Sequence, residues 1–272
     1  MSYAKQIGDF HLNLSGNISY NKNDVTNLNV LPFINDGGWQ GASTNQQRTV
    51  VGQPIYSWYV YKVIGIFQSQ AQIDNYKNAD GTLIQPNAKP GDFQYAHPSG
   101  TGTIGPSDRE YDGSPFPPWT YGFNFAASYK QFDILVFGQG VWGNKIFQEY
   151  RRLDIATANY PIEALNAWTP TNTNTNYPRL TDADPNGNFT NPSDFYLHSG
   201  AYFRVKSAQL GYTLPKWVNQ KLDISKLRVY ISGDNLFTIT KYNGYDPEIS
   251  SGIDEGLYPA ARTLRVGVDA TF

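Results

Sequence analysis

The last ten residues of the chain alternate strictly between apolar and polar side chains. Residues 263–272 place Leu, Val, Val, Ala and Phe at the even positions, whereas Thr, Arg, Gly, Asp and Thr occupy the odd positions. A β-strand sends successive side chains to opposite faces, so the pattern predicts a strand with one apolar and one polar face. Its length is about what a tilted strand needs to cross a membrane core.

Similar alternation recurs along the chain and indicates an all-β fold. We predict seven strands, at residues 10–20, 55–67, 121–129, 132–142, 207–214, 227–237 and 263–272. The run 55–67 differs from the others because it is apolar on both faces. Soluble β-sandwiches also alternate, so the pattern alone does not identify the architecture.

The lengths of the connections separate these architectures. Strands 121–129 and 132–142 are joined by a very tight turn, and a short segment containing Pro215 joins strands 207–214 and 227–237. The other connections are long and polar, at residues 68–118, 143–202 and 238–262. Short turns that alternate with long loops are typical of an antiparallel transmembrane β-barrel with long extracellular loops.

Composition is consistent with this prediction and excludes several alternatives. No stretch approaches 18 consecutive apolar residues, which excludes a transmembrane helix but not a strand that meets lipid with every second residue. The 20 Tyr, 15 Phe and 6 Trp suit either membrane-interface girdles or a carbohydrate-binding β domain. A net charge of −2 with scattered Lys and Arg argues against nucleic-acid binding, and the lack of Cys excludes disulfides and thiolate metal sites.

Candidate catalytic chemistry is weak. Asp108, Glu110 and Asp112 lie close together, but flanking Gly and Pro indicate solvated loop carboxylates rather than a glycosidase pair. The three His residues lack a metal-ligand spacing. We therefore predict no catalytic residue, no metal and no cofactor, and we interpret the run TNTNTN at 171–176 as a solvated spacer.

Several motifs occur in a specific order. YFRVKSAQLGYTLP at 202–215 is followed by LRVYISGDNLFTITKYNGYDPEIS at 227–250 and by GLYPAARTLRVGVDATF at 256–272. Earlier motifs are VGQPIYSWYVYKVIGIFQS at 51–69, KPGDFQY at 89–95 and PWTYGFNFAASYKQFDILVFGQGVWGN at 118–144. Over essentially the whole chain, this order resembles the carboxyl-terminal part of SusC/RagA-family TonB-dependent outer-membrane transporters.

The resemblance implies that residues 1–272 supply about the last seven strands of a 22-stranded barrel. The signal peptide, the plug domain and the earlier strands would then be absent from the chain. The implied function is uptake of glycans or oligopeptides, without enzyme activity, in the outer membrane of a Gram-negative bacterium. The implied partners are a SusD-like lipoprotein at the extracellular mouth, the rest of the barrel and plug, TonB through the missing amino-terminal region, and membrane lipid with lipopolysaccharide.

Strand parity predicts which residues face the lumen, because a charge on the lipid face costs about 2–4 kcal/mol at the membrane centre. The predicted lumen-facing residues are Ser207, Gln209, Arg228, Arg265 and Asp269. Phe272 is the expected barrel-assembly terminus. The loop aromatics Trp119, Tyr245 and Tyr258 are candidates for stacking on sugar rings, with positions in an interface girdle or in loop packing as the alternative.

Two loop motifs carry further expectations. Family members commonly have a calcium-like Asp-x-Asn-x-Asp-Gly stretch after GDFQY, but residues 97–102 read HPSGTG here, so we do not expect an ion. We expect Asp246 and Glu248 to order their loop. The alternative to a transporter is a soluble secreted β-sandwich that binds carbohydrate. In a sandwich, the apolar strand faces would be buried against a second sheet.

Overall fold

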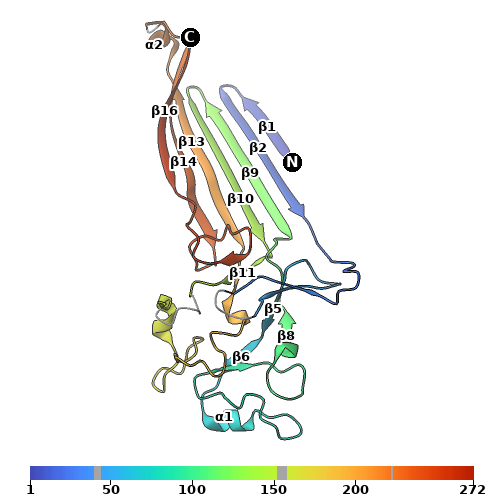
Figure 1. Ribbon diagram of the computed structural model, residues 1–272. Helices are drawn as coiled ribbons and strands as arrows, with labels where there is room; N and C mark the ends of the chain where they lie inside the picture. The colour runs from blue at the N-terminus through green and yellow to red at the C-terminus, as the bar shows by residue number, and fades with distance from the viewer. Residues whose placement is uncertain (40–43, 152–157, 222) are drawn as a thin grey trace.

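The computed structural model describes residues 1–39, 44–151, 158–221 and 223–272. Its largest element is an antiparallel seven-stranded sheet, which we call the wall (Figure 1). The wall consists, in spatial order, of β1 (Ser2–Ile7), β2 (Phe10–Tyr20), β9 (Trp119–Tyr129), β10 (Phe132–Trp142), β13 (Tyr202–Thr213), β14 (Lys226–Thr240) and β16 (Thr263–Thr271). Each strand pairs with the wall strands before and after it in the chain, which is the predicted up-and-down order.

The connections of the wall alternate in length as expected. Tight turns join β1 to β2 and β9 to β10, where Lys130 has a positive φ of 53° that suits a two-residue hairpin. A short connection with helix α2 (Lys216–Lys221) joins β13 to β14. The three long connections, 21–118, 143–201 and 241–262, lie together at the opposite end of the wall from α2 (Figure 1). We call them the loop assembly.

Three small sheets organise the loop assembly. The first contains β3 (Ile34–Asp36), β4 (Gln47–Thr49), β5 (Ser57–Tyr61) and β8 (Arg109–Tyr111). The second contains β11 (Lys145–Gln148), β12 (Leu197–Ser199) and β15 (Ile253–Asp254), and the third pairs β6 (Val63–Ile66) with β7 (Phe93–Tyr95). Helix α1 (Gln70–Asn75) and short 3-10 turns at Pro106–Asp108, Ile162–Asn166 and Asp194–Tyr196 complete the described part.

The prediction of a wall strand at 55–67 was wrong. That run forms β5 and β6, which belong to two different sheets of the loop assembly. Its apolar side chains point both ways because protein covers both sides, and the successive residues Trp58 and Tyr59, which face opposite sides, are both buried. The seventh wall strand is instead β1, which was not predicted because it has only six residues and weak alternation.

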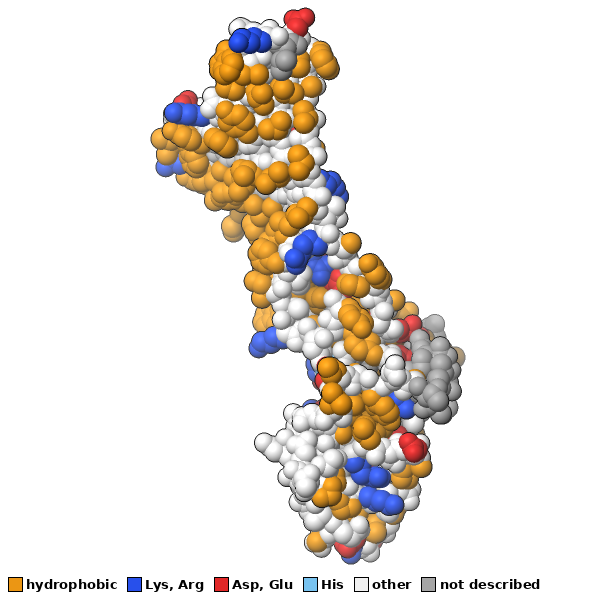
Figure 2. Space-filling view, turned by 90° about the vertical axis from the view of Figure 1, so that its left-hand side faces the viewer, with side chains coloured by type: hydrophobic (Ala, Val, Ile, Leu, Met, Phe, Trp, Pro, Cys, Tyr) orange, Lys and Arg blue, Asp and Glu red, His pale blue; other side chains and the backbone are white. Residues whose placement is uncertain are grey.

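One face of the wall is apolar and uncovered. Cross-strand pairing places Ile134, Leu210, Ile231 and Val266 in one row across four strands. Val266 is 81% exposed, and apolar side chains gather over this part of the molecule (Figure 2). Within the described residues no second sheet packs on this face, which is not the arrangement of the sandwich alternative.

The wall is an open sheet among the residues that the structure describes, with β1 and β16 as its edges. Barrel closure is therefore not seen in this chain. None of the described helices is long and apolar enough to cross a membrane. The buried core lies in the loop assembly rather than in the wall, and its largest fully buried side chains include Trp58, Phe67, Phe93, Tyr95 and Phe147.

Candidate functional site

The predicted lumen-facing residues share the polar face of the wall. Register pairs Arg228 with Asp269 and Ser232 with Arg265, so their side chains lie opposite to the apolar row of Val266. Ser207 and Gln209 lie on the same polar face of β13. Whether this face borders a lumen is not decided by an open sheet, so the assignment stays a prediction.

Charges on the polar face are paired. Arg228 donates to Asp133 on β10 at 2.6 and 2.9 Å and to Asp269 on β16 at 2.9 Å, so one guanidinium links three strands. Arg265 and Asp234 form an ion pair at 2.6 Å. Bidentate Arg–carboxylate geometry fixes the register of the strands as well as neutralising the charge.

Glycines on the polar face make room for flat side chains. A Cβ at Gly267 would lie 2.3 Å from Cζ of Tyr230, and one at Gly211 would lie 2.4 Å from Nη2 of Arg228. Both distances are shorter than any allowed contact. Tyr230 and Arg228 can therefore lie flat along the sheet, because Gly267 and Gly211 on the neighbouring strands have no Cβ at these positions.

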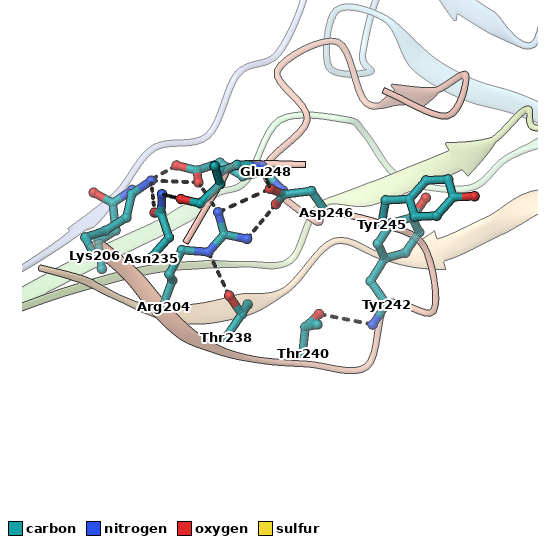
Figure 3. A network of polar contacts seen from close by, with 12 residues as sticks. Arg204, Lys206, Asn235, Thr238, Thr240, Tyr242, Tyr245, Asp246 and Glu248 are labelled. Atoms are coloured by element: carbon teal, nitrogen blue, oxygen red, sulfur yellow. Dashed lines mark hydrogen bonds and ion pairs between the residues drawn. The ribbon is translucent and has the colours of Figure 1, made fainter. Parts of the chain in front are cut away.

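A network centred on the buried Arg204 joins the end of the wall to the connection 241–262 (Figure 3). Arg204 on β13 is 4% exposed and donates to Asp246 at 2.6 Å and to Glu248 at 2.7 Å. Its Nε donates to Thr238 Oγ1 on β14 at 2.7 Å. Lys206 adds a second contact to Glu248, at 2.8 Å. This arrangement is the loop-ordering contact expected for Asp246 and Glu248.

Backbone donors complete the site of Asp246. Its two oxygens accept the amides of Glu248 and Ala260, each at 2.9 Å. Burial raises the pKa of Asp246, but the hydrogen bonds from Arg204 and the two amides outweigh it and hold the pKa below its ordinary value. The carboxylate is thus ionised and holds both ends of the loop against the wall.

A second carboxylate orders the same connection. Asp254 accepts hydrogen bonds from the hydroxyls of Tyr150 and Tyr242, and its other oxygen accepts the amide of Gly256 at 3.0 Å. Burial, followed by the hydrogen bond to Asp254, raises the pKa of Tyr242. The hydroxyl of Tyr150 also accepts the amide of Tyr245 at 3.1 Å, which ties the connection 241–262 to the end of β11.

The three candidate aromatics are not brought together. Trp119 starts β9 on the apolar face, in a row with Tyr20 and Trp142, which favours the interface-girdle alternative. Tyr245 lies beside Tyr150 with ring centroids 5.5 Å apart, and Tyr258 is 91% exposed in the connection 241–262. Phe272 follows β16 and is exposed.

The prediction of solvated loop carboxylates at 108–112 was wrong for Asp108, whose side chain is buried. The fully buried Asp108 lies 3.0 Å from Nδ1 of His97 and accepts the amides of Ser99 and Gly105. Asp112 pairs with Lys145. The stretch at 97–102 is thus ordered by its contacts with the Asp108 carboxylate. Across the described ranges, no group of three His, Asp or Glu side chains is placed to hold a metal ion.

Sequence reasoning missed a cavity of about 440 Å³ in the loop assembly. Six aromatic side chains line it, namely Trp39, Tyr150, Tyr177, Phe189, Phe195 and Tyr196. Amide side chains line it as well, namely Gln148, Asn166, Asn176 and Asn243. Burial raises the pKa of Tyr177 to about 12 and lowers that of His198, another lining residue. Asn176 ends the TNTNTN run, so this run is not only a solvated spacer.

Comparisons with known proteins agree with the geometry. No family model matches the chain. A TonB-dependent receptor of Formosa agariphila is 32% identical over 280 residues, which cover 97% of this chain and 27% of that receptor. The TonB-dependent receptor SusC of Bacteroides thetaiotaomicron is 26% identical over 271 residues, covering 97% of this chain and 25% of SusC. The structure of the RagAB peptide transporter also matches, with a TM-score of 0.74 and 23% sequence identity. The match covers all of this chain and 28% of the transporter chain.

The chain belongs to the SusC/RagA-type TonB-dependent receptors. This confirms the resemblance seen in the motifs, and with it a non-enzymatic family of the Gram-negative outer membrane. As a SusC/RagA-type receptor sequence, the chain spans about a quarter of the length of the curated relatives that it matches. The likeness to the RagAB structure shows the fold, with the wall matching part of a barrel.

Proposed function

We propose that the chain forms part of the barrel wall and of the extracellular mouth of a TonB-dependent nutrient importer. The observation that carries this proposal is the wall itself, which is apolar and exposed on one face and polar with paired charges on the other. Such a sheet is stable where lipid meets one face and water meets the other. The loop assembly at one end of the wall then forms part of the mouth.

The free edges of the wall indicate what else the importer needs. In the sheet formed by the described residues, β1 and β16 are the edge strands, so each has backbone N–H and C=O groups without a strand partner on one side. In hydrocarbon, each unsatisfied group costs several kcal/mol, so a membrane-spanning sheet closes into a barrel. We propose that further strands pair with both edges in a barrel of about 22 strands, which a plug fills.

The proposed cycle assigns each part a role. A SusD-like lipoprotein captures a glycan or an oligopeptide at the extracellular mouth, and TonB acts on the plug to open a path. Ser207, Gln209, Arg228, Arg265 and Asp269 line that path. Phe272 and the short turns lie on the periplasmic side, where the end of the last strand is recognised during barrel assembly.

Topology and transport are tested separately. Residues 1–272 contain no Cys, so a Cys introduced there is the only thiol of this segment, and its labelling is compared with that of the parent receptor. With the complete open reading frame expressed in its host, an impermeant maleimide should label Tyr258→Cys on intact cells but Lys130→Cys only after the outer membrane is opened. Labelling of both on intact cells would contradict the orientation. The transport function is tested by nutrient uptake, which we expect to require both this gene and TonB. Uptake that is unchanged in a strain without TonB would refute it.

A further inference from the structure

We infer that the cavity in the loop assembly is a binding site for a neutral sugar unit. This inference rests on the proposed import function and names its substrate class. The cavity lies between β11, β12 and the segment that contains Tyr177, so residues from all three long connections meet there. Its volume of about 440 Å³ is within the range of roughly 300–1,000 Å³ typical of small-molecule sites.

Two donors at the cavity lack acceptors among the residues that the structure describes. Trp39 is 3% exposed, and its Nε1 has no hydrogen-bond partner in the described part of the chain, nor has Nε of Arg151. A buried donor left unpaired carries the cost of its lost hydration. A ligand that brings oxygen acceptors into the cavity relieves this cost, so both donors favour an oxygen-rich occupant.

The indole of Trp39 is held in place before any ligand arrives. Its ring packs edge-on against Phe147 and Tyr196, with centroids 5.3 and 4.8 Å away. Because these contacts fix the ring, the direction of Nε1 is fixed as well. A donor that is already oriented loses little conformational entropy when it binds, which is how rigid sites gain affinity.

The polar lining suits hydroxyl groups. The four amide side chains, like sugar hydroxyls, both donate and accept hydrogen bonds. Burial lowers the pKa of His198, so its imidazole is neutral at pH 7. Among the charged lining residues, Glu149 is approached by Gln46 at 3.4 Å, and Arg151 and Glu163 carry opposite charges. The lining therefore has no strong surplus of either sign to select a charged ligand.

The aromatic walls supply the apolar part of the site. Sugar rings present C–H faces that pack on aromatic side chains, while their hydroxyls point outward to polar groups. Tyr177 and Phe189 are buried and in ring contact, 6.1 Å apart, which makes that side of the cavity rigid. An extended peptide would instead be expected to pair its backbone with a strand edge, and β12, whose His198 lines the cavity, has a free edge in the sheet of described residues. Peptides are therefore the competing occupant that the experiment has to include.

The TNTNTN run offers a matched pair of variants. Asn176 lines the cavity, whereas Asn174 does not, and both side chains are at least partly exposed. The variant Asn176→Trp fills the cavity, whereas the variant Asn174→Trp adds the same side chain to the nearby surface. Binding is measured by calorimetry on the full-length receptor in detergent, with hexasaccharides of α-glucan, β-glucan, xylan and mannan and with a tryptic peptide mixture as probes.

We expect at least one hexasaccharide to bind, Asn176→Trp to weaken that binding by about tenfold or more, and Asn174→Trp to leave it within about twofold. Asn176→Ala, a milder change, should weaken it less. The inference is overturned if no hexasaccharide binds, if only peptides bind, or if Asn176→Trp binds as the parent does. TonB-dependent uptake by the parent receptor would still stand in each of those cases, so the two failures are distinguishable.

Discussion

Removal of the Arg204 guanidinium should release the connection 241–262 from the wall. In Arg204→Leu, the buried carboxylate of Asp246 loses its charged partner and keeps only the two backbone amides. Breaking a buried ion pair by removing one partner costs about 3–5 kcal/mol, because the remaining charge is left uncompensated. The wall strands keep their own hydrogen bonds, so the cost should appear as local opening of the loop.

The amides of Glu248 and Ala260 report this opening, because both donate to Asp246. A loss of about 3 kcal/mol corresponds to more than a hundredfold rise in the open population. Hydrogen exchange followed by mass spectrometry should therefore show protection at these two amides falling by about that factor. Peptides from β9 and β10 should exchange as they do in the parent.

Lys206→Met provides the matched control. Its ammonium contacts the same Glu248 at 2.8 Å, but both side chains are partly exposed, and such pairs contribute about 0–1 kcal/mol. Loop protection should change by no more than about fivefold. Equal effects of the two variants, or unchanged exchange in Arg204→Leu, would refute the assignment of Arg204 as the anchor of the loop.

Three further changes test other parts of the structure. Gly267→Leu should abolish the folded, heat-modifiable species on gels because its Cβ meets Tyr230, and Tyr230→Ala in the same chain should restore it; failure to restore would contradict this reason. Val266→Lys on the apolar face should lower the free energy of unfolding in lipid vesicles by about 2–4 kcal/mol, whereas Val266→Leu should not. The pKa of Asp246 is lowered in the folded state, so its stabilisation is present above its ordinary value of 3.8 and lost as pH falls through the folded value. Exchange protection at Ala260, corrected for the intrinsic rate, should therefore be constant from about pH 7 to 5 and fall below about pH 4; a fall already at pH 6 would contradict it.

The wall was predictable from sequence because its two faces differ in polarity, so that apolar and polar side chains alternate along each strand. Strand β16 shows this most clearly, since Val266 and Arg265 are neighbours in the chain and face opposite environments. The prediction at 55–67 failed because β5 is enclosed by protein on both sides, where alternation carries no information. Strand β1 was missed because six residues are too few for a period of two to be distinguished from chance.

The cavity was not predictable because its residues meet only after the loop assembly has folded. Trp39, Asn176 and Asn243 come from three different connections, and no local spacing links them. Trp119 illustrates a different difficulty, since an aromatic residue beside a loop is typical of both a girdle and a sugar platform. Only its place in the row with Tyr20 and Trp142 distinguishes them.

The distribution of the core indicates that the loop assembly is preformed. The wall has little interior of its own, because lipid would meet one face and water the other, whereas Trp58, Phe93 and Tyr95 are fully buried in the loop assembly. The long connections thus fold around their own aromatic core. Arg204 then joins this rigid body to the wall through Asp246, a carboxylate fixed by four hydrogen bonds. Because a preformed site loses little entropy on binding, the packed core of the loop assembly would favour affinity at the cavity that we propose as a sugar site.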